Sequence, residues 1–189
     1  DPNANPEPSN PSGWRASTNP FASPAADDPT PIIPGILVNE ALTHTDPPLI
    51  DAIELYNPTA AGVNVGGWFL TDDASVPTKY RIPDSTVVAA NGQIYFDEDD
   101  FNVPLGASNS FSLSSVGDDV YLFSAATDGT LTGYGHGVVF GASFNGVSFG
   151  RYVNSAGEEF YPRQTAVSLG ATNSGPNIGP VVISEIHYH

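Results

Sequence analysis

The sequence predicts an all-β protein, an antiparallel β-sandwich of about nine strands with extended N- and C-terminal segments, on three observations. Gly and Pro together make up 37 of the 189 residues (19 + 18), and both disfavour helix interiors. Apolar and polar residues alternate over short runs, which is typical of half-buried strands. Turn dipeptides separate these runs, and no stretch has a helical period.

The predicted strands run from Ile36 to Pro162 and are separated by turn signals. Asn91-Gly92 lies between two apolar runs and predicts a β-hairpin, and Gly117-Asp118 predicts a second turn between strands. Asp128-Gly129, Asn145-Gly146 and Gly157 mark later turns. The predicted strand regions are Ile36–Leu42, Asp51–Thr59, Val65–Asp73, Lys79–Pro83, Thr86–Asp100, Phe111–Ser124, Leu131–Gly141, Gly146–Val153 and Glu158–Pro162.

The opening stretch Ile36–His44 (ILVNEALTH) returns in related form at Val181–His189 (VVISEIHYH). Aligning Glu40 with Glu185 gives an offset of 185 − 40 = 145 residues. Four further pairs match at this offset without a gap: Ser23 and Ser168, Ala26 and Ala171, Pro31 and Pro176, Ile33 and Ile178. A fixed-offset similarity of this kind indicates a repeat.

The repeat predicts three parts of the chain. Residues 1–34 form an extended Pro/Ser/Asn-rich linker or docking arm that ends a preceding repeat. Residues 35–172 form the sandwich domain. Residues 173–189 form a linker and a terminal strand, which starts a following repeat or acts as a donor strand for another copy.

The charge balance limits the kinds of molecule that the chain is expected to bind. Five Lys and Arg stand against 21 Asp and Glu, giving a net charge of −16. Such a surface repels nucleic acids and anionic membranes. No apolar run approaches the ~18 residues that span a bilayer, so we expect no membrane insertion. The absence of Cys excludes disulfides.

A set of motifs resembles the lamin tail domain family, whose members are immunoglobulin-like β-sandwiches. The motifs are ILVNE (Ile36–Glu40), IELYNPT (Ile53–Thr59), GGWFLTDD (Gly66–Asp73), YRIP (Tyr80–Pro83), NGQIYF (Asn91–Phe96) and FSLSSVGDDVYLF (Phe111–Phe123). The later GVSFGRY (Gly146–Tyr152) is similar to the closing part of bacterial members. The resemblance implies a non-catalytic domain of the bacterial type, found often in tandem in secreted and cell-surface proteins.

Individual residues within this resemblance have expected places. We expect Trp68 to anchor the core between the two sheets. Glu40 and Glu54 are expected at the surface or at a strand edge, because they flank strand positions.

The terminal segments carry the candidate interaction residues. An apolar strand without a sheet of its own exposes unpaired backbone groups and adds to a sheet edge. In the docking arm, the residues expected to pack on a neighbouring surface are Trp14, Arg15 and Phe21. The expected assembly strand consists of Val181, Val182, Ile183, Ser184, Glu185, Ile186, His187 and Tyr188.

No cofactor is expected, apart from one open alternative. The acidic run contains Asp97, Glu98, Asp99 and Asp100, and loop carboxylates supply the oxygens that a structural Ca²⁺ ion prefers. The other interpretation is a solvated turn whose charges protect a strand edge.

Catalysis is not expected. Gly146–Gly150 fits the Gly-x-Ser-x-Gly pattern of hydrolases, but that chemistry needs a helix after the Ser, and here the sequence continues as a strand.

The sequence therefore predicts an extracellular, cell-surface structural module that joins copies of itself or neighbouring repeats head to tail, as a fibre or tandem array. The alternative is a carbohydrate- or calcium-binding accessory or adhesion module of a larger secreted protein, in which Tyr134, Phe144 and Tyr161 form an exposed aromatic platform for glycans.

Overall fold

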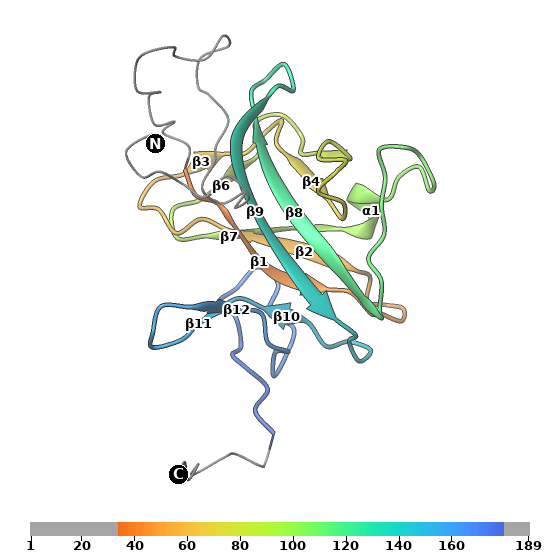
Figure 1. The fold of residues 1–189 in the computed structure, drawn as a ribbon, viewed down its shortest axis with the longest axis vertical. Coiled ribbons are helices and arrows are strands. Elements are labelled where there is room, and N and C mark those ends of the chain that lie inside the picture. The colour runs from red at the N-terminus through yellow and green to blue at the C-terminus, as the bar shows by residue number, and fades with distance from the viewer. Residues whose placement is uncertain (1–33, 180–189) are drawn as a thin grey trace, which may run out of the picture.

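The computed structural model describes residues 34–179, which form two four-stranded antiparallel sheets (Figure 1). One sheet has the strand order β10-β1-β2-β7 and the other β5-β4-β8-β9, and β3-β6 and β11-β12 are separate two-stranded sheets. The strands are β1 (Leu37–Leu42), β2 (Ala52–Tyr56), β3 (Val63–Asn64), β4 (Phe69–Thr71), β5 (Tyr80–Arg81), β6 (Val87–Val88), β7 (Gln93–Asp97), β8 (Gly117–Ala125), β9 (Leu131–Gly141), β10 (Phe149–Gly150), β11 (Tyr152–Val153) and β12 (Glu159–Phe160), and the one helix of the described residues is α1 (Glu98–Phe101).

The predicted β-sandwich is confirmed, and its apolar core lies between the two larger sheets. One face of β2 contributes Ile53 and Leu55, and β8 contributes Val120 and Leu122 from the other sheet. Trp68 is 6% exposed and belongs to the same core cluster. The predicted role of Trp68 as a core anchor is therefore confirmed.

The long hairpin β8–β9 follows directly from the sequence. Asp128-Gly129 makes the predicted turn, in which the Gly129 N–H donates to the Ala126 carbonyl at 2.9 Å. Gly137 faces Tyr121 across the pair, and a Cβ atom at residue 137 would lie 2.1 Å from the Tyr121 ring. Only glycine therefore permits this close approach of β9 to its neighbour.

Two turn predictions are wrong in detail. Asn91-Gly92 turns the chain, but β6 pairs with β3 and β7 pairs with β2, so the flanking strands are not a hairpin. The Asn57 amide, after the end of β2, donates to the Ala61, Val88 and Ala89 carbonyls and so ties the end of β6 to the segment after β2. Gly117-Asp118 lies inside β8 and pairs with Gly141 and Phe140.

The acidic run forms one helical turn. The Asp97 carboxylate accepts from the Asp99 N–H at 3.1 Å. It also accepts from the Asp100 N–H, and the Asp100 carboxylate accepts from the Asp97 N–H at 3.3 Å, and these two reciprocal bonds make a capping box. Acidic residues in a first turn also interact favourably with the helix dipole. Phe101 is the buried residue of the turn and stacks on Phe111 with ring centroids 4.7 Å apart.

The core position Leu122 gives a direct test of the two-sheet packing. We expect Leu122→Ala to lower the free energy of unfolding by about 2–5 kcal/mol, because Leu122 is 0% exposed and its removal leaves a cavity. The matched control is Val139→Ala on β9, where the side chain is 71% exposed and the expected change is within about 0.5 kcal/mol. Equal losses in chemical denaturation would contradict this core assignment.

Candidate functional site

Two glutamates lie side by side on the central strands of the first sheet. Glu40 on β1 and Glu54 on β2 are register partners, and both are 0% exposed. The expectation that they lie at the surface or at an edge is therefore wrong. The physical reason is that a later part of the chain covers the outer face of β1 and β2, so both faces of these strands are buried. We call Glu40 and Glu54 the carboxylate pair.

The covering element is residues 165–175, which we call the closing loop. Its ends lie together, because the Thr165 N–H donates to the Gly175 carbonyl at 3.0 Å. Its middle reaches the carboxylate pair. Ser168 donates its N–H to Glu40 Oε1 at 2.9 Å and its hydroxyl to Glu40 Oε2 at 2.6 Å. The Gly170 N–H donates to Glu54 Oε2.

Glycine at residue 170 makes this geometry accessible. Gly170 has φ +79°, in the left-handed region that side chains with a Cβ rarely adopt. Two side chains of the sandwich complete the donors to the carboxylate pair: the Asn39 amide reaches Glu54 Oε1 at 2.6 Å, and the Ser148 hydroxyl reaches Glu40 Oε1 at 2.5 Å.

The closing loop continues beyond the predicted domain end at residue 172. The Asn39 amide donates to Asn173 Oδ1 at 2.8 Å, and the Asn173 amide donates to the Arg151 carbonyl at 3.0 Å. The Asn177 N–H then donates to the Arg163 carbonyl at 2.7 Å. Residues 173–177 therefore contact the sandwich.

Burial controls the protonation of Glu54. Desolvation raises the pKa of the Glu54 carboxyl to about 7, and the neighbouring Glu40 adds to the rise. The hydrogen bonds from Asn39 and Gly170 act in the opposite direction, because they favour the ionised form. Glu54 therefore changes its charge near neutral pH.

On the side away from β2, β10 pairs only with Glu40 and Ala41 of β1. Backbone groups of Ile36 and Val38, which come before these residues, bond side chains instead. The Tyr134 hydroxyl donates to the Ile36 carbonyl at 2.7 Å, and the Tyr161 hydroxyl donates to the Val38 carbonyl at 2.7 Å. The Val38 N–H donates to His136 Nδ1 at 3.0 Å. His136 is therefore the tautomer with hydrogen on Nε2, which lies 3.1 Å from Glu159 Oε1.

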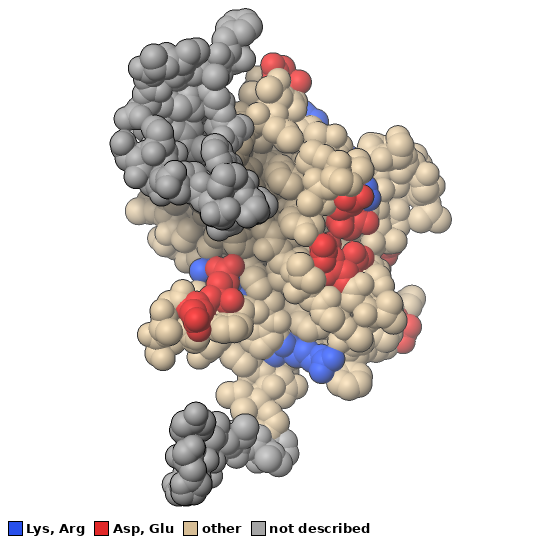
Figure 2. Space-filling view, in the orientation of Figure 1, with Lys and Arg blue, Asp and Glu red and all other residues tan. Residues whose placement is uncertain are grey.

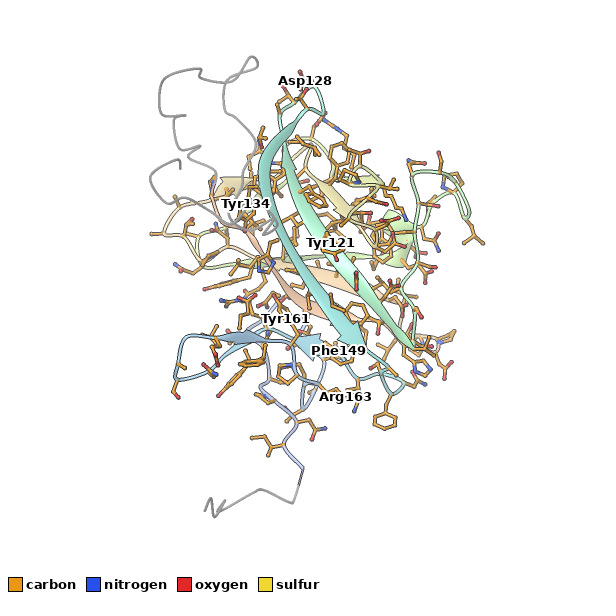
Figure 3. All side chains as sticks on the ribbon, viewed as in Figure 1. Tyr121, Asp128, Tyr134, Phe149, Tyr161 and Arg163 are labelled. Carbon is orange, nitrogen blue, oxygen red and sulfur yellow. The ribbon has the colours of Figure 1, made fainter. Side chains whose placement is uncertain are left out.

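The expected aromatic platform is not formed. Tyr134 and Tyr161 pack against the core (Figure 3), and burial raises both of their pKa values, that of Tyr134 to about 12. Only Phe144 of the three is exposed, at 67%, and the Arg163 guanidinium lies 4.9 Å from its ring centroid. No planar row of exposed rings results from these three residues.

The carboxylates of the acidic run accept hydrogen bonds from neighbouring residues. Asp97 and Asp100 serve the capping box, and Glu98 Oε1 accepts from the Asn102 amide at 2.8 Å. Across residues 34–179, no group of three or more His, Cys, Asp or Glu side chains is arranged to hold a metal ion. Figure 2 shows more acidic than basic side chains on the face it presents.

The Gly-x-Ser-x-Gly stretch carries a buried structural serine. Ser148 is 0% exposed, and its hydroxyl is engaged by Glu40. β10 and β11 follow it, where a nucleophile elbow has a helix.

The predicted docking arm (Trp14, Arg15, Phe21) and the predicted assembly strand (Val181–Tyr188) lie outside the described residues. In the described part of the chain, no helix is long and apolar enough to cross a membrane.

The two packed antiparallel sheets and the absence of helices beyond one turn in residues 34–179 define an immunoglobulin-like β-sandwich module. The family model described as Lamin Tail Domain matches residues 29–137, which is more than half of the chain. The chain therefore belongs to the lamin tail domain family, a family of non-enzymatic immunoglobulin-like domains. No curated protein and no solved structure gave a significant match.

The contact between the closing loop and Glu40 can be tested by one substitution. We expect Ser168→Ala to lower the free energy of unfolding by about 1–3 kcal/mol, because Glu40 Oε2 stays buried without this hydroxyl donor. Ser155→Ala, in an exposed turn, is the matched control. Chemical denaturation that ranks the two variants equally would contradict the role of Ser168.

His136 should titrate below its ordinary range. Burial lowers the pKa of His136, while Glu159 acts against this effect. Protonation of Nδ1 also removes the acceptor of the Val38 N–H. A histidine with a lowered folded pKa stabilises the fold above pH ~6.5 and loses this contribution as the pH falls through the folded value. A histidine-ring NMR titration checks this prediction, and a midpoint at or above 6.5 would contradict it.

Proposed function

We propose that the chain is a non-catalytic structural module of the bacterial extracellular type, which joins equivalent units head to tail at the cell surface through its terminal segments. The units are either neighbouring repeats in one polypeptide or separate copies of this chain. The membership of the chain in the lamin tail domain family supports a non-enzymatic module. The net charge of −16 disfavours nucleic acids and anionic membranes as its partners.

One observation carries this proposal. The structure joins Ser168 to Glu40 by two hydrogen bonds across 128 positions of the chain. The sequence repeats both members of this contact at the same offset, as Ser23 and Glu185. Because the two residues of one buried contact repeat together, Ser23 is suited to the closing loop of a preceding unit. Glu185 is suited to the opening strand of a following unit.

The place of β1 explains why a second copy of its sequence favours assembly. β1 is an interior strand that pairs with β2 on one side and β10 on the other. Its position in this domain is therefore filled by Leu37–Leu42. If the related sequence Val181–His189 forms the same strand, as we propose, it needs the β2 and β10 of another unit to bury its apolar side chains.

The ends of the described chain suit a head-to-tail arrangement. The start of β1 lies toward β3 and β6, and the last described segment extends from the other end of the molecule, beyond β10 and β11 (Figure 1). A unit that is entered at one end and left at the other extends an array without folding back on its neighbour. A heterologous contact of this kind grows into a filament where its rotation does not close a ring.

A fused second domain tests the role of the terminal strand. Residues 45–179 are appended directly after His189, so that Val181–His189 stands where Ile36–His44 stands in the first domain. We expect the added domain to fold, with a doubled heat of unfolding in calorimetry, because the terminal strand supplies its β1. In the control fusion a Gly/Ser sequence replaces residues 181–189, and only one domain should fold.

The free chain tests assembly between separate copies. We compare the mass in solution, by light scattering over a range of concentrations, for the full chain and for a variant that lacks residues 180–189. Association that depends on these ten residues supports a fibre of separate copies. If the full chain is monomeric but the second domain of the fusion folds, the terminal strand joins repeats within one polypeptide and does not join separate copies. An unfolded second domain in the fusion, with no association of the free chain, contradicts the proposal.

A further inference from the structure

The closing loop is attached to the sheet by side-chain contacts, and its base is separate from its tip. At the base, the Thr165 N–H bonds the Gly175 carbonyl, and Gln164 forms an isolated bridge with Pro176. At the tip, Ser168 and Gly170 donate to the carboxylate pair in the sheet below, and the other bonds of Ser168 are to Ala171 and Ser174 of the loop itself. The tip can therefore leave the sheet while the base stays paired, as in other compact loops whose ends are close together.

The carboxylate pair has no basic residue beside it in the described structure. The titratable side chains that face Glu54 are Glu40 on β1 and Tyr95, its register partner on β7. Residues 165–175 contain no titratable side chain. Arg151 lies beyond Asn39, and its Nε bonds Glu159 Oε2 at 2.5 Å. Two buried acidic groups therefore share one site without a compensating cation.

Two hollows border the loop on the outer face of the sheet. One has a volume of about 220 Å³ and a polar lining that includes Gln93, Asn173 and Arg151. The other has a volume of about 210 Å³ and lies between Leu169 of the loop and the side chains of Leu49 and Tyr95. Water therefore has access to both flanks of the loop, so that displacement of the tip hydrates the carboxylate pair.

We infer that the closing loop is a pH-dependent latch, which is closed over the carboxylate pair in mildly acidic solution and opens at its tip as the solution becomes alkaline. The latch belongs to a single unit and does not depend on assembly. Its opening joins the two hollows into one continuous groove across β1, β2 and β7.

The direction of the pH effect follows from the two states of Glu54. In the closed state burial raises the pKa of Glu54 to about 7, whereas in the open state the solvated carboxyl returns toward its ordinary 4.5. The raised value means that the closed state favours the protonated form. The stabilisation that protonated Glu54 gives to the closed state is complete below the open-state pKa. It is lost as the pH rises through the closed-state pKa. The opening equilibrium should therefore increase by up to about two orders of magnitude between pH 5 and pH 8.

Hydrogen exchange with mass spectrometry measures the opening directly. Exchange of the amides of Ser168 and Gly170 is recorded from pH 5 to pH 8 and divided by the intrinsic rate at each pH. We expect the protection of these two amides to fall by ten- to a hundredfold, while amides of β8 keep their protection. In Glu54→Gln this pH dependence should disappear, because residue 54 no longer titrates. Glu158→Gln, an exposed glutamate, should behave as the unaltered protein does.

Two results would overturn the latch. The first is protection of the loop that is constant with pH in the unaltered protein. The second is an unchanged pH dependence in Glu54→Gln. If Glu54→Gln unfolds, the carboxyl carbon of Glu54 is titrated by NMR in the unaltered protein. Its midpoint must then coincide with the loss of loop protection, and a midpoint near 4.5 contradicts the latch.

Discussion

The structure depends on one costly constraint, the burial of two carboxylates on neighbouring interior strands. Removing a carboxylate from water is expensive unless donors replace its hydration. Here the donors come from three parts of the chain: Asn39 on β1, Ser148 before β10, and Ser168 with Gly170 in the closing loop. The last of these parts is a loop without strand pairing of its own. Its order therefore depends on the carboxylates, and their burial depends on the loop.

Much of the fold could be predicted from the sequence, because period-two runs and turn dipeptides report on local structure. β9 and its Asp128-Gly129 turn were predicted to the residue. The strand partners around Asn91 could not be predicted, because β6 and β7 do not pair with each other but with strands earlier in the chain, β3 and β2. The pairing of β6 with β3 is thus a tertiary effect that no local signal contains.

The site was predicted less well, for a related reason. Alternation along β2 places Glu54 on the face opposite Ile53 and Leu55, in agreement with the structure, and Glu40 is the register partner of Glu54 on β1. What covers this face lies over 110 residues away, so burial could not be seen in either strand. One signal did point to the contact: Ser23 and Glu185 repeat Ser168 and Glu40 at one offset. Of the residues that match at this offset, Ser168 and Glu40 are in contact in the structure.

This contact also bears on how the units of the proposed array would remain independent. Because Ser168 and Glu40 belong to the same domain, the closing loop bonds the first strand of its own domain. Bringing together residues 128 positions apart has an entropic cost that grows only slowly with separation, and buried polar contacts offset it once the sandwich has formed. A domain that holds its own opening strand in this way can supply a further opening strand to another unit without releasing its own. In the proposed array, the same contact that completes one fold would therefore limit mispairing between neighbouring units.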